Sequence, residues 1–171
     1  MKLLITGATG LVGNSLIEKY TQQGIQIHYL TTRKSQFKSI DGAQGYYWNP
    51  NKNKIDLACF LGVDSIIHLA GATVSKRWTK AYKEKIHSSR VLSTQLLLKG
   101  LQSCKGDHQV KQLVSASAIG IYPSDFEKVM NEEVAVEPTA FMQKVVYDWE
   151  REVDAFKAEG VPVTKIRIGL V

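Results

Sequence analysis

The chain begins with MKLLITGATGLVG (residues 1–13), in which a short apolar run passes directly into glycines at positions 7, 10 and 13. The apolar run suits a buried strand and the residues after Gly13 are amphipathic, so the pattern predicts a strand, a tight turn and a helix. Glycines let the backbone approach a phosphate closely, and the new helix offers unpaired amides and a positive dipole end. The stretch therefore predicts a dinucleotide-binding turn formed by Thr6, Gly7, Thr9, Gly10, Leu11, Val12 and Gly13.

The spacing of these glycines is GxxGxxG and differs from the GxGxxG of the general dinucleotide fingerprint. Glycines in such a triplet can also serve only to shape a turn. Position favours the binding interpretation here, because the triplet follows an apolar strand and opens a helix.

Composition indicates one soluble globular domain. The chain has 171 residues, of which 44% are hydrophobic and 22% charged, and no segment approaches the apolar length of a membrane span. The first apolar run is broken at Thr6, so a signal peptide is not predicted. Cys59 and Cys104 lie far apart without metal-ligand spacing, so neither a metal site nor a disulfide is expected and a reducing cytoplasm fits best.

The chain carries a net charge of +6, with a pI near 9.3. Such an excess favours an anionic partner. Nucleic acid is one candidate, but no nucleic-acid motif accompanies the basic residues, and a phosphorylated cofactor or substrate also supplies negative charge.

Apolar strand patterns alternate with helical patterns along the whole chain. Strands are predicted over residues 25–32, 45–49, 64–72, 112–118 and 163–171, and helices from residue 11, over about 79–103, and from Pro138 to Gly160. This alternation predicts an α/β fold of the Rossmann type: a doubly wound parallel sheet with helices on both faces, in a single domain over residues 1–171.

The end of the second predicted strand indicates which dinucleotide binds. An acidic residue usually holds the adenosine ribose at this point, but the sequence reads Thr31, Thr32, Arg33 and Lys34. A carboxylate would repel a 2′-phosphate, whereas Arg33 can clamp one with assistance from Thr32 or Lys34, so the prediction is NADP rather than NAD. The alternative is that Arg33 is a solvated loop residue.

Several other residues follow strands whose carboxyl ends should form the ligand crevice. Ser115 and Ser117 end the fifth predicted strand, where their hydroxyls could bond a group at the reactive ring of the cofactor or could simply cap the strand. His68 lies within an apolar run and is interpreted as a core histidine rather than a catalytic base. Arg77 and Trp78 could face a substrate or anchor the following helix.

Six motifs together carry a family resemblance: TGATGLVG at 6–13, TTR ending at Arg33, YYWNP at 46–50, HLAGATVSKRWT at 68–79, SASAIGIY at 115–122 and DWE at 148–150. Over essentially its whole length the chain resembles the atypical branch of the extended short-chain dehydrogenases, described as NAD-dependent epimerase/dehydratase-like or nucleoside-diphosphate-sugar epimerase family proteins. The resemblance implies that the glycine turn and Arg33 bind NADP, that Leu69, Ala70 and Gly71 flank its adenosine half, and that Ser117 stands where the superfamily has its catalytic serine.

The superfamily's Tyr-x-x-x-Lys pair is missing. Counting back from Glu150, the two positions are Met142 and Val146, neither of which can transfer a proton. Both lie on the apolar stripe of the predicted helix. Tyr122 is then a speculative proton carrier beside Ser117.

Extended members of this family continue into a smaller region that shapes the substrate pocket, and this chain ends at Val171, so a fragment is expected. Two functions remain open. The first is an NADP-dependent oxidoreductase or epimerase acting by hydride transfer on a small molecule such as a sugar nucleotide. The second is a regulatory or interaction protein that senses NADP(H) without turnover.

Overall fold

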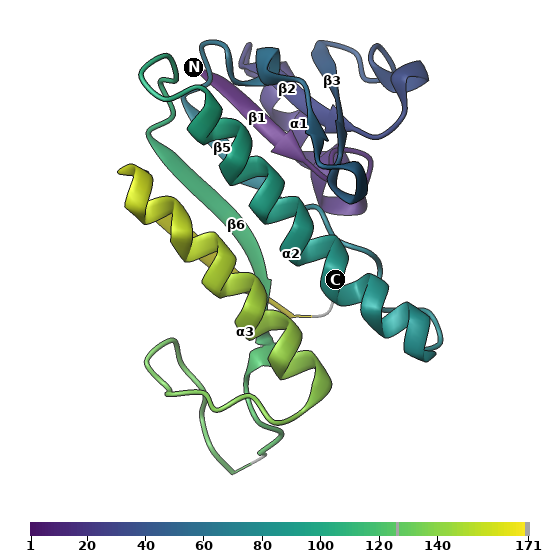
Figure 1. Cartoon of the computed structure of the whole chain (residues 1–171), viewed down its shortest axis with the longest axis vertical. Coiled ribbons are helices and arrows are strands. Elements are labelled where there is room, and N and C mark those ends of the chain that lie inside the picture. The colour runs from purple at the N-terminus through teal and green to yellow at the C-terminus, as the bar shows by residue number, and fades with distance from the viewer. Residues whose placement is uncertain (126, 170–171) are drawn as a thin grey trace.

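The computed structural model describes residues 1–125 and 127–169, and within them the chain forms one twisted sheet covered by three helices (Figure 1). The strands are β1 (Lys2–Thr6), β2 (Gln26–Thr31), β3 (Ala43–Asn49), β4 (Lys54–Ile55), β5 (Ser65–His68), β6 (Gln112–Ala118) and β7 (Val163–Ile168). Their order is β4-β3-β2-β1-β5-β6-β7, and every pairing is parallel except β3 with β4. The predicted doubly wound parallel sheet is therefore confirmed.

The helices α1 (Leu11–Gln22), α2 (Lys80–Ser103) and α3 (Phe141–Asp154) cover opposite faces of this sheet. Alternate residues of one strand serve the two faces, since successive side chains point to opposite sides. Leu3 and Ile5 of β1 pack with Ile17 of α1, whereas Leu4 lies in the larger cluster with Leu97 of α2. The fold thus has helices on both faces, as the alternation of elements predicts. Among the described residues, no helix is long and apolar enough to cross a membrane.

Three predicted boundaries change for identifiable reasons. β5 ends at His68 instead of continuing to Ala72: the amide of Leu69 still reaches the Thr6 carbonyl of β1 at 3.3 Å, but it and the amide of Ala70 also donate to the Thr6 hydroxyl, which turns the chain out of the ladder. Beyond the predicted strand over residues 45–49, Lys54 and Ile55 form a two-residue antiparallel edge strand that pairs back with Asn49 and Trp48. The last strand ends at Ile168; the further residues 170 and 171 of that prediction lie outside the described part of the chain.

The third helix begins at Phe141, so the prediction that Pro138 opens it is wrong. The side-chain oxygen of Gln143 accepts hydrogen bonds from the amides of Thr139 and Ala140, at 3.0 and 2.8 Å. This contact fixes Ala140 as the residue before the first helical turn. Gly160 does end the segment, in a left-handed conformation after a short 3-10 turn over Ala155–Glu159.

Candidate nucleotide-binding site

The glycine turn between β1 and α1 leaves no room for side chains. Gly7 has φ +72°, and a Cβ there would lie 2.9 Å from the backbone of Leu69. A Cβ at Gly13 would lie 2.3 Å from the Gly7 carbonyl oxygen. The first turn of α1 has no side-chain cap, since Gly10 precedes it, so its amides are free to meet an anion.

Two hollows flank this turn. One, of about 320 Å³, is bordered by Gly7, Ala8 and Thr9, by residues 30–33 with Gln36 and Trp48, and by Ala70 and Gly71. The other, of about 260 Å³, is bordered by residues 10–13 together with Gly7, Leu69, Ala116 and Ile168. Gly7 borders both hollows, which together are called the groove, and they lie at the carboxyl ends of the strands, where open α/β sheets bind ligands. The predicted residues of the glycine turn, of 32–33 and of 69–71 all border it, with the exception of Thr6.

Thr6 lies beneath the groove and ties three elements together. Its hydroxyl accepts hydrogen bonds from the amides of Leu69 and Ala70 and contacts His68 Nδ1 at 2.8 Å. Because that oxygen already accepts two hydrogens, its own hydrogen is left for Nδ1, and the ring proton of His68 lies on Nε2. Nε2 then donates to Thr94 on α2 at 3.0 Å, and the Thr94 hydroxyl donates to the Arg90 carbonyl at 2.8 Å.

His68 is fully buried within this chain of hydrogen bonds. Burial lowers its pKa to about 4, so the ring is neutral at physiological pH. The interpretation of His68 as a core histidine is confirmed, and its function is to position the ends of β1 and β5 against α2.

Arg33 stands at the outer end of the groove. Its amide donates to the Thr31 hydroxyl at 3.2 Å, while its side chain is exposed and forms no hydrogen bond or ion pair with a described residue. Thr32 beside it is exposed too, and Trp48, from the neighbouring strand, closes the wall of this hollow. The guanidinium is therefore available to an anionic ligand.

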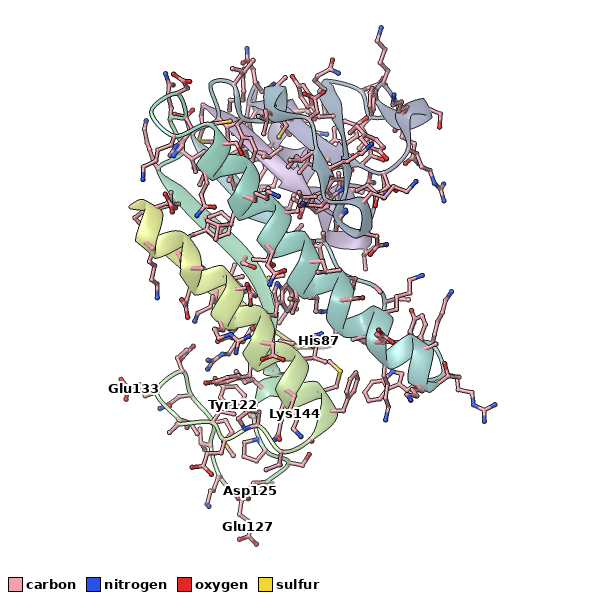
Figure 2. The ribbon with its side chains drawn as sticks, viewed as in Figure 1. His87, Tyr122, Asp125, Glu127, Glu133 and Lys144 are labelled. Atoms are coloured by element: carbon pink, nitrogen blue, oxygen red, sulfur yellow. The ribbon has the colours of Figure 1, made fainter. Side chains whose placement is uncertain are left out.

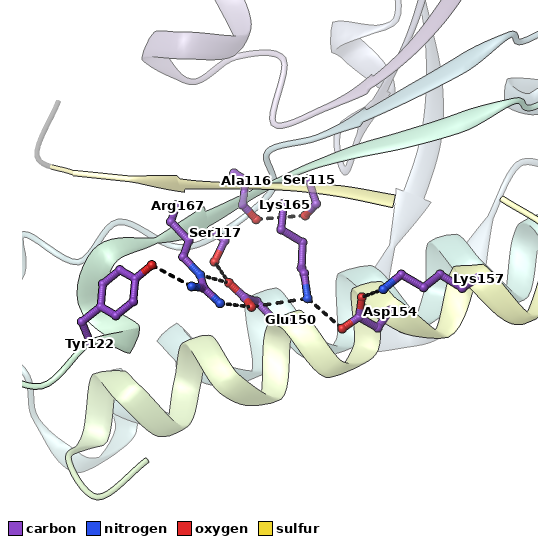
Figure 3. A network of polar contacts seen from close by, with 9 residues as sticks. All are labelled: Ser115, Ala116, Ser117, Tyr122, Glu150, Asp154, Lys157, Lys165 and Arg167. Atoms are coloured by element: carbon purple, nitrogen blue, oxygen red, sulfur yellow. Dashed lines mark hydrogen bonds and ion pairs between the residues drawn. The ribbon is translucent and has the colours of Figure 1, made fainter. Parts of the chain in front are cut away.

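Ser117 points away from this groove and into a buried ion network on the α3 face (Figure 3). Its hydroxyl donates to Glu150 Oε1 at 2.5 Å, and Arg167 forms a two-pronged pair with the same carboxylate at 2.9 and 3.0 Å. Lys165 joins from β7, 3.4 Å from Glu150 and 2.7 Å from Asp154. Ser115, on the same side of β6, is completely buried and donates to the Ala116 carbonyl.

Tyr122 belongs to the same network through its hydroxyl, which accepts from Arg167 Nη1 at 2.7 Å (Figure 3). Figure 2 shows Tyr122 near the beginning of α3, beside the loop that carries Asp125, Glu127 and Glu133. Burial alone would raise the pKa of Glu150, but hydrogen bonds from Arg167 and Ser117 and the charge of Lys165 lower it. The Glu150 contact raises the pKa of Arg167. The network thus holds both predicted catalytic hydroxyls, Ser117 through Glu150 and Tyr122 through Arg167.

The structure therefore brings the predicted cofactor residues together except Thr6, which lies beneath the groove, and Ser115, which is buried on the α3 side of β6. It also separates the predicted catalytic hydroxyls of Ser117 and Tyr122 from the groove. Ala116 and Ile168 occupy its inner end instead, and neither is among the predicted site residues. The alternation of side chains along β6 is a signal that could have found Ala116, since it points opposite to Ser115 and Ser117. Glu150 and Arg167 carried no local signal of their pairing, because 17 residues separate them.

Comparison with known proteins agrees with this geometry. The family model for the NAD dependent epimerase/dehydratase family matches residues 3–160. An epimerase family protein of Staphylococcus saprophyticus is 37% identical over 170 residues, which cover 98% of this chain and 54% of that protein. The chain thus spans about half the length of this curated relative.

Solved structures share the fold. The UDP-glucuronic acid 4-epimerase of Bacillus cereus, solved with NAD, superposes with a TM-score of 0.77 at 18% identity, over 98% of this chain and 56% of that one. A human epimerase family protein solved with NADPH has a TM-score of 0.71 at 21% identity, over 89% of this chain and 48% of that one. The family match and these folds confirm the predicted resemblance: the chain belongs to the NAD dependent epimerase/dehydratase family.

Proposed function

We propose that this chain is the NADP-binding part of an oxidoreductase or epimerase that acts by hydride transfer on a small alcohol or carbonyl compound such as a sugar nucleotide. The observation that carries the proposal is the groove on both sides of the glycine turn, in which a Cβ at Gly7 or Gly13 would collide with backbone. Such close main-chain packing, followed by an uncapped helix, fits a pyrophosphate. The family membership and the fold it shares with nucleotide-sugar enzymes support the same function.

In this proposal the outer hollow binds the adenosine half of the dinucleotide and the inner hollow binds the nicotinamide half. The amides at the start of α1 would hold the pyrophosphate, and Arg33 with Thr32 would bind the 2′-phosphate on the adenosine ribose. Leu69, Ala116 and Ile168 form an apolar wall at the inner end, suited to a nicotinamide ring. Bound NADP supplies the hydride chemistry, and this wall excludes water from the reacting ring.

Fewer residues support the proton-transfer step than support binding of the cofactor. Ser117 and Tyr122 are the proposed donors of a hydrogen bond and a proton, but to reach a reactant in the groove both hydroxyls would have to leave Glu150 and Arg167. Met142 and Val146, at the positions of the superfamily's pair, carry no titratable group. These observations favour a second candidate function, in which the protein senses NADP(H) without turnover and acts on another component of the cytoplasm.

Two measurements test these proposals. Calorimetric titration with NADPH, NADP and NAD tests the site: we expect binding of the phosphorylated forms, and the absence of heat with all three would overturn the proposal. Incubation of the full-length protein with NADPH and a panel of nucleotide sugars and ketones then separates the two functions. Oxidation of the cofactor or formation of an epimer supports catalysis, and neither product with any compound supports the sensing function.

A further inference from the structure

A third hollow, of about 620 Å³, lies at the β4 edge of the sheet, between that strand and the C-terminal half of α2. Its volume is typical of small-molecule sites and exceeds that of either hollow of the groove. No residue borders both this hollow and the groove. We call it the edge hollow, and the proposed function makes no use of it.

The walls of the edge hollow are largely apolar and come from segments far apart in the sequence. The apolar and aromatic side chains that border it are Phe37, Tyr47, Ile55, Leu57 and Leu96. Gly100 allows α2 to pack tightly beside them, since a Cβ there would lie 2.8 Å from the ring of Phe60 and 3.3 Å from Ile55 Cδ1. The edge hollow is thus held open by packing that needs no ligand.

Three lysines border the same hollow. Lys34 follows β2, Lys54 belongs to β4 and Lys99 belongs to α2, so the three charges come from separate segments. None of the three ammonium groups forms a hydrogen bond or an ion pair with a described residue, and that of Lys34 lies 5.9 Å from the ring centre of Tyr47. Among the described residues on the border, Asp56 is the one carboxylate, and its Oδ1 already accepts from the Ala58 amide at 3.1 Å.

The edge hollow and the groove are separated by the geometry of the strands. Arg33 and Trp48 border the outer hollow of the groove, whereas their chain neighbours Lys34 and Tyr47 border the edge hollow. Successive side chains of a strand point to opposite faces, which accounts for the division at β3. A ligand in the edge hollow therefore leaves the groove free for a dinucleotide.

We propose that the edge hollow is a second ligand site, which binds a small organic acid with an aromatic body. The rings of the acid pack against the apolar walls around Tyr47, Ile55 and Leu96, and its anionic group pairs with the lysine ammonium groups. The excess of three lysines over one carboxylate selects an anion over a neutral or cationic ligand. This inference goes beyond the proposed function and does not depend on it.

The test uses the dye anilinonaphthalene sulfonate, which has one anionic group on an aromatic body and fluoresces when its rings leave water. Titrated into the full chain, the dye should bind at one saturable site. The double variant Lys54→Gln/Lys99→Gln should weaken this binding by about tenfold, as expected for loss of a charge-assisted contact. The matched control is Lys80→Gln/Lys85→Gln, which removes two exposed lysines of α2 that border none of the three hollows and should leave binding unchanged.

Two competitors measure what the charge of the ligand contributes. Naphthoate and naphthalenemethanol share the same rings, but only naphthoate is an anion. Naphthoate should displace the dye from the wild type at about tenfold lower concentration than naphthalenemethanol. The variant Lys54→Gln/Lys99→Gln should lose this preference, and a preference equal to that of the wild type would overturn the assignment of the lysines.

Competition with saturating NADP distinguishes the edge hollow from the groove. We expect dye binding to be unchanged, and release of the dye by NADP would place it in the groove and overturn the inference. Equal weakening in both double variants would reduce the effect to net charge, and the absence of saturable binding to the wild type would also overturn it. The lysine variants decide the inference even if NADP does not bind, so its failure and that of the proposed function are distinguishable. Thermal unfolding should show that each variant is folded.

Discussion

The Ser117 hydroxyl is held by the Glu150 carboxylate at 2.5 Å, in a site where the Glu150 side chain is only 8% exposed. The same carboxylate pairs with Arg167 and Lys165, so one acidic side chain joins β6, α3 and β7. Glu150 is thus the group on which two cations depend. Removing it leaves the partly buried Arg167 without a carboxylate partner and leaves Lys165 with Asp154 alone, which costs more than removing a neutral partner.

We therefore expect Glu150→Gln to destabilise the fold by about 3 kcal/mol or more, and Ser117→Ala by about 1 kcal/mol. Urea unfolding followed by circular dichroism measures both. Glu152→Gln is a suitable control, because Glu152 lies on the same helix and its one ion pair with a described residue is the 3.5 Å pair with the exposed Arg151. If the Ser117 and Glu150 variants lost equal stability, the network would not depend on the carboxylate as described.

A second prediction concerns the close packing of the glycine turn. Gly13→Ala places a methyl group 2.3 Å from the Gly7 carbonyl, so α1 must shift away from β1. We expect a loss of about 2 kcal/mol of stability, together with loss of dinucleotide binding, because the amides of α1 move with the helix. Gly120→Ala is the matched control, since the nearest atom to its new Cβ is 3.8 Å away. Thermal unfolding should show a lower melting temperature, and calorimetry a loss of dinucleotide binding, for Gly13→Ala and not for Gly120→Ala.

The sheet was predictable because its signals are local. Each parallel strand is a short apolar run, and the glycine turn marks the start of the first helix. The order of the elements can therefore be read from these local patterns. β4 was not predictable in this way, since Lys54 and Ile55 become a strand only by pairing with Asn49 and Trp48. The start of α3 depends likewise on a side chain, Gln143, that reaches back to residues ahead of the helix.

The candidate site also has a part that local sequence signals predict and a part that depends on tertiary packing. That Arg33 borders the groove could be predicted from its place after β2, because the tip of that strand meets the adenosine ribose in a Rossmann fold, and its role toward a 2′-phosphate stays a prediction. The network around Ser117 could not, since it joins residues 33 and 17 positions apart whose pairing depends on how α3 packs.

A third prediction follows from the buried His68. Its pKa in the folded chain is about 4, against 6.5 for an unperturbed histidine. Between pH 4 and 6.5 the histidine is therefore protonated in the unfolded chain and neutral in the folded chain. Stability therefore falls as pH drops from about 7 to 4, by about 3 kcal/mol from this residue. Urea unfolding at several pH values measures the slope. His68→Gln should reduce it without abolishing it, because burial also lowers the pKa of His28; an unchanged slope would mean that His68 is protonated in the fold.

The last prediction concerns the choice of cofactor. Arg33 lies at the outer end of the groove with an unpaired guanidinium, while the described residues that border that hollow include no carboxylate to receive a ribose 2′-hydroxyl. NADP should therefore bind about tenfold or more tightly than NAD, and Arg33→Ala should remove most of that difference by weakening NADP alone. Raising the salt concentration should narrow the difference in wild type, because the contact is an exposed ion pair. Lys38→Ala, a nearby exposed cation that does not border the hollow, controls for net charge. Equal stabilisation of the wild type by NAD and NADP in a thermal shift experiment would show that Arg33 is a solvated loop residue.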